Sequence, residues 1–185
     1  MNKTDEARNS AAESSPLILT LKLDDATFEF FDLLRKQHFP PERNFIPAHV
    51  TLFHALPGAR KAQIKCDLRQ ATEQTKEFNL TFPRLRFLGK GVAAEIESPE
   101  LNRLRANLSN LWNNFLGAQD RQKGYRPHVT FQNKVAPDAA RQLFEQMSDE
   151  WQPLAARGEA LILWQYLGGP WRLIEEFSFN LFSEL

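Results

Sequence analysis

Two short motifs hold the residues of this chain that could do chemistry. His49-Val50-Thr51 and His128-Val129-Thr130 each place a histidine and a threonine two positions apart, in segments where polar and apolar residues alternate. This alternation is typical of a half-buried β-strand, in which residues i and i+2 share a face. Each strand would then present an imidazole beside a hydroxyl, with apolar side chains buried behind them. Two such pairs are suited to holding and cleaving a phosphate ester.

Two imidazoles that flank one site can divide general acid and general base work, because histidine titrates near neutral pH. One imidazole would take a proton from water, and the other would protonate the oxygen that leaves a cyclic phosphodiester. The hydroxyls of Thr51 and Thr130 would donate hydrogen bonds to the nonbridging phosphate oxygens, whose charge grows in the transition state. We therefore predict that His49 and His128 are catalytic and that Thr51 and Thr130 bind phosphate. This chemistry needs no metal and no cofactor.

A single His-x-Thr segment is a weak signal, because a lone histidine on a strand is usually a solvated or hydrogen-bonded residue. The repetition favours a function. Both copies have valine between the two polar residues, and Pro47 and Pro127 stand shortly before the histidines.

Residues near the motifs are further candidates for contact with a substrate. Arg126 shares the strand face of His128, so it could reach the phosphate of a substrate. The alternative is that Arg126 is a solvated arginine at the edge of the sheet. Phe53 shares a face with the first motif if the alternation continues, and it would stack on a base, the alternative being a core residue. Tyr125, near a loop end, is a similar stacking candidate. His54 is expected on the opposite face from the first motif, which argues against a two-histidine metal site.

Composition limits the class of protein. The 185 residues are 42% hydrophobic and 25% charged, which is ordinary for one globular domain. The 23 basic residues balance the 23 acidic ones, so the net charge is zero. Proteins that coat long nucleic acids need a basic surface, so this balance leaves a small or end-on nucleic-acid ligand.

The cysteine content and the distribution of apolar residues indicate the cellular compartment and the extent of the folded domain. Cys66 is the single cysteine and cannot form an intrachain disulfide, which favours a reducing compartment. No segment approaches the roughly 20 apolar residues that span a bilayer. Residues 1–15 are polar, and we expect a disordered tail there, a folded domain over 16–185 and a cytoplasmic location without membrane contact.

Periodicity and turn signals divide the chain into strands and helices. The predicted strands are 16–23, 46–54, 78–82, 84–87, 92–97, 126–134, 159–167 and 171–182. The predicted helices are 25–37, 59–75, 98–115 and one from residue 137 to before Pro153. The segment 118–124 is predicted to be a loop that could close over a cleft. This order indicates an α+β fold with antiparallel sheets, and the repeated motif indicates an internal duplication into two halves that face each other across a pseudo-twofold cleft.

The segments His49-Val50-Thr51-Leu52 and Arg126-Pro127-His128-Val129-Thr130-Phe131 resemble the two signatures of the two-histidine (2H) phosphoesterase superfamily. Within it they are most similar to the bacterial 2′-5′ RNA ligase-like group, the RNA 2′,3′-cyclic phosphodiesterases. The resemblance implies two pseudo-symmetric lobes of antiparallel sheet, with helices outside and the four motif residues in a central cleft. It also implies hydrolysis of a nucleoside 2′,3′-cyclic phosphate. The chain departs from many relatives at Gln132-Asn133, where they carry a basic residue, and at His54, where they often carry an aromatic one.

These observations together predict a metal-independent cyclic phosphodiesterase. We expect its substrate to be a nucleotide or an RNA end with a 2′,3′-cyclic phosphate, and we expect a monomer with no obligate protein partner. One alternative is a 2H enzyme for another phosphoester, such as ADP-ribose cyclic phosphate, which the zero net charge favours. The other is a nucleotide- or RNA-binding module without catalysis, which the two intact motifs argue against.

Overall fold

The computed structural model describes residues 15–122 and 124–181. Its strands are β1 (Leu17–Leu23), β2 (Val50–Leu56), β3 (Phe78–Phe82), β4 (Leu85–Phe87), β5 (Val92–Glu95), β6 (His128–Gln132), β7 (Leu154–Tyr166) and β8 (Trp171–Ser178). Its α-helices are α2 (Asp25–His38), α3 (Lys61–Glu73), α4 (Pro99–Leu111), α5 (Ala118–Arg121) and α6 (Pro137–Glu150), with 3₁₀ turns at Pro41–Arg43 and Gly58–Arg60. Apart from Ser15, the tail expected over 1–15 lies outside the described residues.

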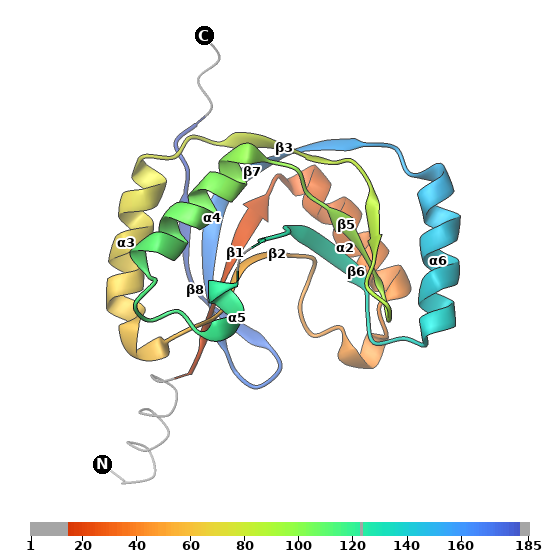
Figure 1. Ribbon diagram of the computed structural model, residues 1–185, viewed down its shortest axis with the longest axis horizontal. Helices are drawn as coiled ribbons and strands as arrows, with labels where there is room; N and C mark the ends of the chain where they lie inside the picture. The colour runs from red at the N-terminus through yellow and green to blue at the C-terminus, as the bar shows by residue number, and fades with distance from the viewer. Residues whose placement is uncertain (1–14, 123, 182–185) are drawn as a thin grey trace, which may run out of the picture.

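The described strands form one curled, antiparallel sheet that resembles half of a barrel (Figure 1). The strand order is β3-β7-β1-β2-β6-β5-β4, and β8 also pairs with β7. The long strand β7 carries β3 along its first residues and β8 along its later ones. The predicted α+β class with antiparallel sheets is confirmed.

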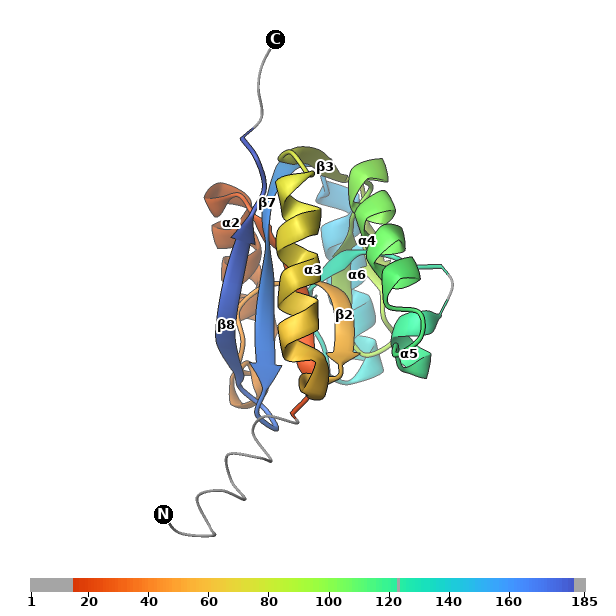
Figure 2. The ribbon, with the colours of Figure 1, turned by 90° about the vertical axis from the view of Figure 1, so that its left-hand side faces the viewer.

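The sheet consists of two halves that meet at one point. The first half-sheet contains β3, β7, β8, β1 and β2, and the second contains β6, β5 and β4. Between them, β2 and β6 pair in register at Val50 and Val129. Helix α3 packs on β7 and β8, whereas α6 packs on β4 and β5. Figure 2 shows α3 beside β7, with α4 and α5 on its far side. The two predicted motifs therefore lie on the strands where the halves join.

Local sequence signals set the starts of two helices as predicted. Asp24 caps α2, because its carboxylate accepts a hydrogen bond from the backbone N–H of Thr27 at 3.0 Å. Ser98 caps α4 through a bond from the N–H of Leu101, and Pro99 occupies the first helical position. These caps pair backbone donors that have no partner inside the helix.

Several boundaries differ from the sequence-based prediction, and three differences concern the sheet or the surroundings of the motifs. β2 begins at Val50 and not at residue 46, since the preceding residues run through bends before the motif. β7 begins at Leu154, because its first residues pair with β3 as far as Phe82. The predicted loop 118–124 contains the short helix α5, although residue 123 lies outside the described residues.

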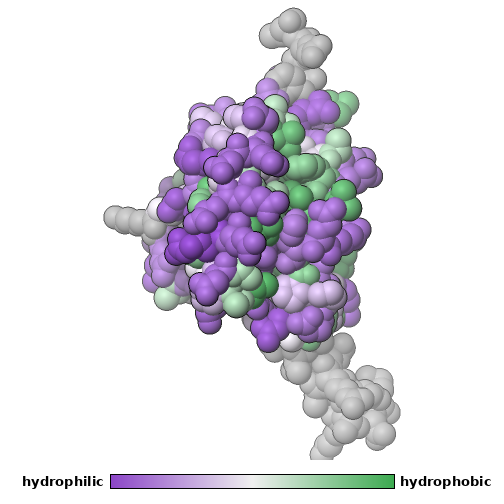
Figure 3. Space-filling view, turned by 90° about the vertical axis from the view of Figure 1, so that its right-hand side faces the viewer, coloured by the Kyte–Doolittle hydropathy of each residue, from purple (hydrophilic) through white to green (hydrophobic). Residues whose placement is uncertain are grey.

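The core lies between the curled sheet and its helices. Large, fully buried side chains fill it, among them Phe31, Phe82, Trp112 and Phe131. The surface on the side of α6 is mostly hydrophilic (Figure 3), as expected for a helix with one face turned to water. In the part of the chain that the structure describes, no helix is both long and apolar enough to cross a membrane.

Candidate active site

The pairing of Val50 with Val129 brings the two motifs together. The strands are antiparallel, so continuing the register by one residue on either side sets His49 opposite Thr130 and Thr51 opposite His128. Residues opposite one another in such a pair have Cβ atoms about 4.5–5.5 Å apart. Both valines are fully buried, so their neighbours in each strand project from the other face of the sheet. The four predicted side chains thus form one patch with a pseudo-twofold axis through the valine pair.

The two imidazoles are oriented in the same way. Nδ1 of His49 lies 2.8 Å from the carbonyl oxygen of Pro47, and Nδ1 of His128 lies 2.9 Å from that of Arg126. A carbonyl oxygen only accepts, so each Nδ1 carries the hydrogen and donates it. Each bond runs to the residue two positions earlier. Both Nε2 atoms keep a lone pair that can act on a ligand.

Burial favours the neutral form of both rings. Desolvation lowers the pKa of His49 to about 4, against a smaller opposing effect of the Pro47 carbonyl. Desolvation also lowers the pKa of His128 below its ordinary value. Positive charge on His128 lowers the pKa of His49 further, so the two rings lie within range of each other's electrostatic field. An anion bound between them would oppose these effects and favour protonation.

A β-bulge interrupts the alternation of β2. Thr20 of β1 pairs with Thr51, but the preceding Leu19 pairs with Phe53, so two residues of β2 separate positions that are adjacent in β1. The extra residue is Leu52. Phe53 and His54 therefore change faces, as a one-residue insertion requires, and a second shift follows between the pairs Leu19–Phe53 and Leu17–Leu56.

The bulge makes two of the predictions wrong. Phe53, proposed to stack on a base, is 0% exposed and packs against Trp112, with the Arg105 guanidinium 3.9 Å from its ring centre. His54, expected on the opposite face, has a side chain that is 50% exposed and takes the orientation that Phe53 was expected to have. Its backbone N–H and its Nδ1 both contact the carboxylate of Asp120 in α5, at 2.8 and 3.3 Å.

The two remaining candidates lie just before the second motif. Tyr125 donates a hydrogen bond from its hydroxyl to the carbonyl oxygen of Thr51 at 3.0 Å, so its contact is with the backbone of the first motif. Burial raises the pKa of Tyr125, which keeps the hydroxyl a donor. The guanidinium of Arg126 lies 2.6 Å from Glu95, and the side chain is 67% exposed. Glu95 pairs with His128 across β5 and β6.

Two buried arginines near the site were not identified from the sequence. Arg35 of α2 donates to the carbonyl oxygens of Ile46 and Thr130, at 3.0 and 2.7 Å. Arg105 of α4 donates to the carbonyl oxygen of Leu52 at 2.8 Å. Helix α2 precedes the first motif in the chain, but Arg35 binds the strand of the second motif. Helix α4 precedes the second motif, but Arg105 binds the strand of the first. The only sequence signal was an arginine on the inner face of a predicted helix.

A cavity of about 330 Å³ opens beside His49. Its walls are mainly aromatic and aliphatic, and they include Phe28, Phe45 and Trp164. The ring of Trp171 lies 4.8 Å from that of His49, centre to centre. The cavity therefore extends the motif patch along the first half-sheet.

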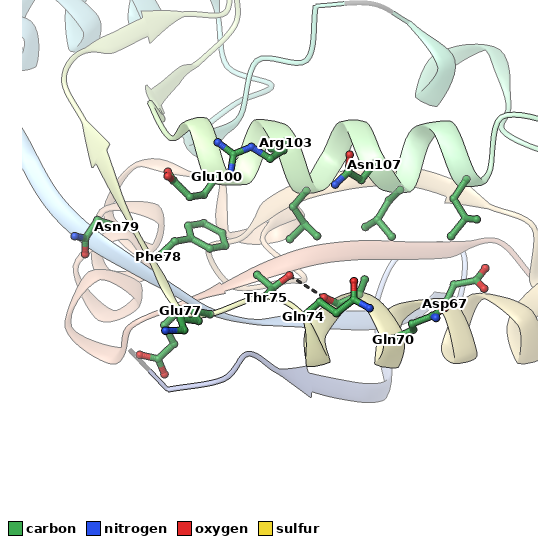
Figure 4. A pocket seen from close by; sticks show the side chains of 15 residues that line it. Asp67, Gln70, Gln74, Thr75, Glu77, Phe78, Asn79, Glu100, Arg103 and Asn107 are labelled. Carbon is green, nitrogen blue, oxygen red and sulfur yellow. Dashed lines mark hydrogen bonds between the residues drawn. The ribbon is translucent and has the colours of Figure 1, made fainter. Parts of the chain in front are cut away.

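A larger hollow of about 640 Å³ lies elsewhere, between α3 and α4 (Figure 4). Polar side chains such as Asp67, Gln70 and Asn107 line it together with leucines of α4. The four motif residues are not part of its wall, so this hollow is separate from the candidate active site.

The site offers imidazoles and hydroxyls to a ligand. Among the described residues, no group of three His, Cys, Asp or Glu side chains is arranged to hold a metal ion. Two Nε2 atoms and two threonine hydroxyls, contributed equally by the two half-sheets, suit a tetrahedral anion such as phosphate.

Comparison with protein families identifies the family that the two motifs resemble. The family model of the 2′-5′ RNA ligase superfamily matches residues 23–170. None of the curated proteins is similar enough in sequence to match the chain.

Solved structures share the fold at low sequence identity. The protein TT0787 of Thermus thermophilus has a TM-score of 0.65 at 16% identity, over 89% of this chain and 98% of that one. E. coli LigT in complex with 3′-AMP has a TM-score of 0.55 at 17% identity, over 90% of this chain and 99% of that one. E. coli LigT in complex with ATP has a TM-score of 0.52 at 19% identity, over 90% and 98%. At such identities the similarity establishes the fold.

Proposed function

The chain belongs to the 2′-5′ RNA ligase superfamily of 2H phosphoesterases, and we propose that within it the protein is a metal-independent cyclic phosphodiesterase. The proposed reaction is hydrolysis of a 2′,3′-cyclic phosphate, on a nucleotide or at an RNA end, to a monophosphate. The observation that carries this proposal is the motif patch, in which the valine pair sets each histidine opposite the threonine of the other strand. Both Nε2 atoms are available for proton transfer because both Nδ1 atoms are bound to carbonyls.

The mechanism follows from these atoms. One imidazole accepts a proton from water at Nε2 while the water oxygen forms a bond to phosphorus. The other imidazole is protonated once the phosphate anion is bound, and it donates this proton from Nε2 to the ribose oxygen as the ring P–O bond breaks. Each transfer contributes typically 10²–10⁴ in rate. The two rings have equivalent Nδ1 bonds, so either can be the base in this scheme.

The threonines stabilise the charge that develops during this reaction. Thr51 and Thr130 donate hydrogen bonds to the two nonbridging oxygens from opposite sides of the patch. Their backbones are held in place, since Tyr125 binds the carbonyl of Thr51 and Arg35 binds that of Thr130. A donor fixed before the reaction needs no reorganisation during it.

The shape of the site supports a nucleotide or a chain end as the substrate. The cavity beside His49 is near the lower limit of small-molecule pockets, which are about 300–1,000 Å³. Its aromatic wall at Trp171 suits the base of a nucleoside whose phosphate lies between the motifs. Two solved structures of E. coli LigT, which shares the fold, contain 3′-AMP and ATP. We further propose that the protein acts as a cytoplasmic monomer.

Another cyclic phosphoester, such as ADP-ribose cyclic phosphate, is the second candidate substrate. The zero net charge favours a small substrate over a long polyanion. A panel with EDTA present distinguishes the candidates: a nucleoside 2′,3′-cyclic phosphate, an RNA with a 2′,3′-cyclic end and ADP-ribose cyclic phosphate. We expect the highest kcat/KM for one of the first two. Turnover of ADP-ribose cyclic phosphate alone would support the second candidate, and nucleotide binding without any turnover would indicate a binding module.

A further inference from the structure

We propose that His54 is a third histidine of the substrate site, which donates a hydrogen bond to the phosphate group held between His49 and His128. The inference deepens the proposed function, because it depends on a phosphate in the motif patch. Its starting point is the bulge at Leu52, which turns His54 out of the core and leaves its side chain 50% exposed. It takes the exposed position that the sequence suggested for Phe53, but with a hydrogen bond to phosphate in place of a ring stacked on a base.

Asp120 fixes the orientation of the His54 ring. One carboxylate oxygen accepts the backbone N–H of His54 and lies 3.3 Å from Nδ1, while the other accepts the N–H of Ala55 at 2.9 Å. Because Asp120 occupies Nδ1, Nε2 lies on the opposite edge of the ring, away from α5. The side chain of Asp120 is almost fully buried, so the partner of Nδ1 is fixed in place.

The carboxylate is ionised in this environment. Burial by itself raises the pKa of Asp120, but the hydrogen bonds from His54 and Ala55 have the larger combined effect and lower it. With Nδ1 directed at this carboxylate, Nε2 is the ring nitrogen left for a hydrogen bond to a phosphate oxygen, and a bond to an ionised acceptor is stronger than one between neutral groups.

The position of His54 on β2, three residues after Thr51, sets it beside the motif patch. Positive charge on His54 lowers the pKa of both His49 and His128, so its ring lies within electrostatic range of both. Along β2 it is the next residue on the exposed face after Thr51, on the side where His128 stands across the strand pair. Arg86 and Glu95, on the strands beyond His128, are the other charged groups that act on that ring.

A purely structural role for His54 predicts something different. In that case the ring would serve only to hold α5 through Asp120. The backbone N–H groups of His54 and Ala55 already bind this carboxylate and remain in any substitution of the ring. His54→Gln should therefore keep α5 in place, which allows ligand binding to be measured in a folded protein.

The chain offers its own control for the test. It contains four histidines, and the fourth, His38, lies on α2 with its ring packed near Phe131. The experiment follows the imidazole NMR signals of the full chain during titration with inorganic phosphate and then with a nucleoside 2′-monophosphate. The signals are assigned with one His→Gln variant at a time.

We expect phosphate to shift the signals of His49, His54 and His128 with one shared Kd and to leave His38 unchanged. His54→Gln should weaken phosphate binding about three- to tenfold, and His54→Arg, which supplies an N–H donor to phosphate, should recover most of it. In turnover assays His54→Gln should raise KM more than it lowers kcat, whereas His38→Gln should change neither.

Two outcomes separate this inference from the proposed function. Shifts of His49 and His128 with a constant His54 signal would overturn the inference and leave the proposed function intact. Shifts of all three signals in a protein that hydrolyses no cyclic phosphate would support the phosphate contact and contradict the proposed function.

Discussion

Arg35 and Arg105 hold the two motif strands crosswise. Arg35, on the helix before the first motif, binds the carbonyl oxygen of Thr130 in the second, and Arg105, on the helix before the second motif, binds that of Leu52 in the first. Each guanidinium also lies about 4 Å from an aromatic ring centre, at Phe39 and Phe53 respectively. The pseudo-twofold relation thus extends from the motifs to their supports and agrees with an internal duplication.

Removing Arg35 should cost stability, because it takes a donor away from the partly buried carbonyl groups of Ile46 and Thr130. We expect Arg35→Met to lower the free energy of unfolding by about 2–3 kcal/mol. Urea denaturation measures this directly. Arg103→Met, an exposed position on α4, is the matched control and should change stability by less than about 0.5 kcal/mol. Equal stability of Arg35→Met and wild type would show that the crosswise bonds contribute little.

Loss of the motif hydroxyls should reduce catalysis without unfolding the protein. Thr51→Val and Thr130→Val keep the side-chain shape and remove one donor to the phosphate. We expect each to lower kcat/KM by about 10²-fold, the lower end of the effect of losing one oxyanion donor. Thr81→Val on β3, which is exposed and remote, should retain wild-type kinetics. Unchanged kinetics in both motif variants would contradict the phosphate-binding role.

Stability of the ligand-free protein should fall in acid because of His49. Its pKa is about 4 in the folded state and 6.5 ordinarily, so below pH 6.5 the unfolded chain takes up the proton first. The contribution of the neutral His49 ring to the free energy of unfolding is therefore complete above pH 6.5, and it is lost as the pH falls to about 4. It is at most about 3 kcal/mol and smaller for a ring with partial exposure. Urea denaturation at pH 7.5 and pH 5 measures the free energy of unfolding at each pH. The decrease between the two should be smaller for His49→Gln than for the wild type, and an equal decrease in both proteins would contradict the lowered pKa of His49.

Tyr125→Phe tests the support of the first motif. The substitution removes the donor to the carbonyl of Thr51 and keeps the ring. We expect a loss of about 1 kcal/mol in stability and a decrease in kcat of several-fold, because the hydroxyl of Thr51 would be less well positioned. Thermal unfolding and initial rates measure the two effects. A change in KM alone would indicate that Tyr125 contacts the substrate.

The features that the sequence predicted well depend on neighbouring residues. The starts of α2 and α4 lie within one residue of the predicted ones, because each depends on a cap, Asp24 or Ser98, that binds an N–H three residues later. The motif pattern also placed His49, Thr51, His128 and Thr130 on strands or at their ends, and the repetition indicated that they meet.

The features that it missed depend on contacts between distant segments. The bulge at Leu52 exists only relative to β1, so no alternation within β2 could show that Phe53 turns inward and His54 outward. Asp120 in the predicted loop gains its role from the N–H groups of β2, 65 and 66 positions earlier. Arg35 likewise acts on a strand that is 95 residues away.

The most direct test of the account is hydrolysis of a nucleoside 2′,3′-cyclic phosphate with EDTA present, comparing wild type with His49→Gln and His128→Gln. Circular dichroism first establishes that each variant is folded. The account predicts turnover by the wild type and a loss of at least about 10²-fold in kcat for either variant, because each removes one proton transfer. Wild-type turnover that persists in either folded variant would contradict the two-histidine mechanism.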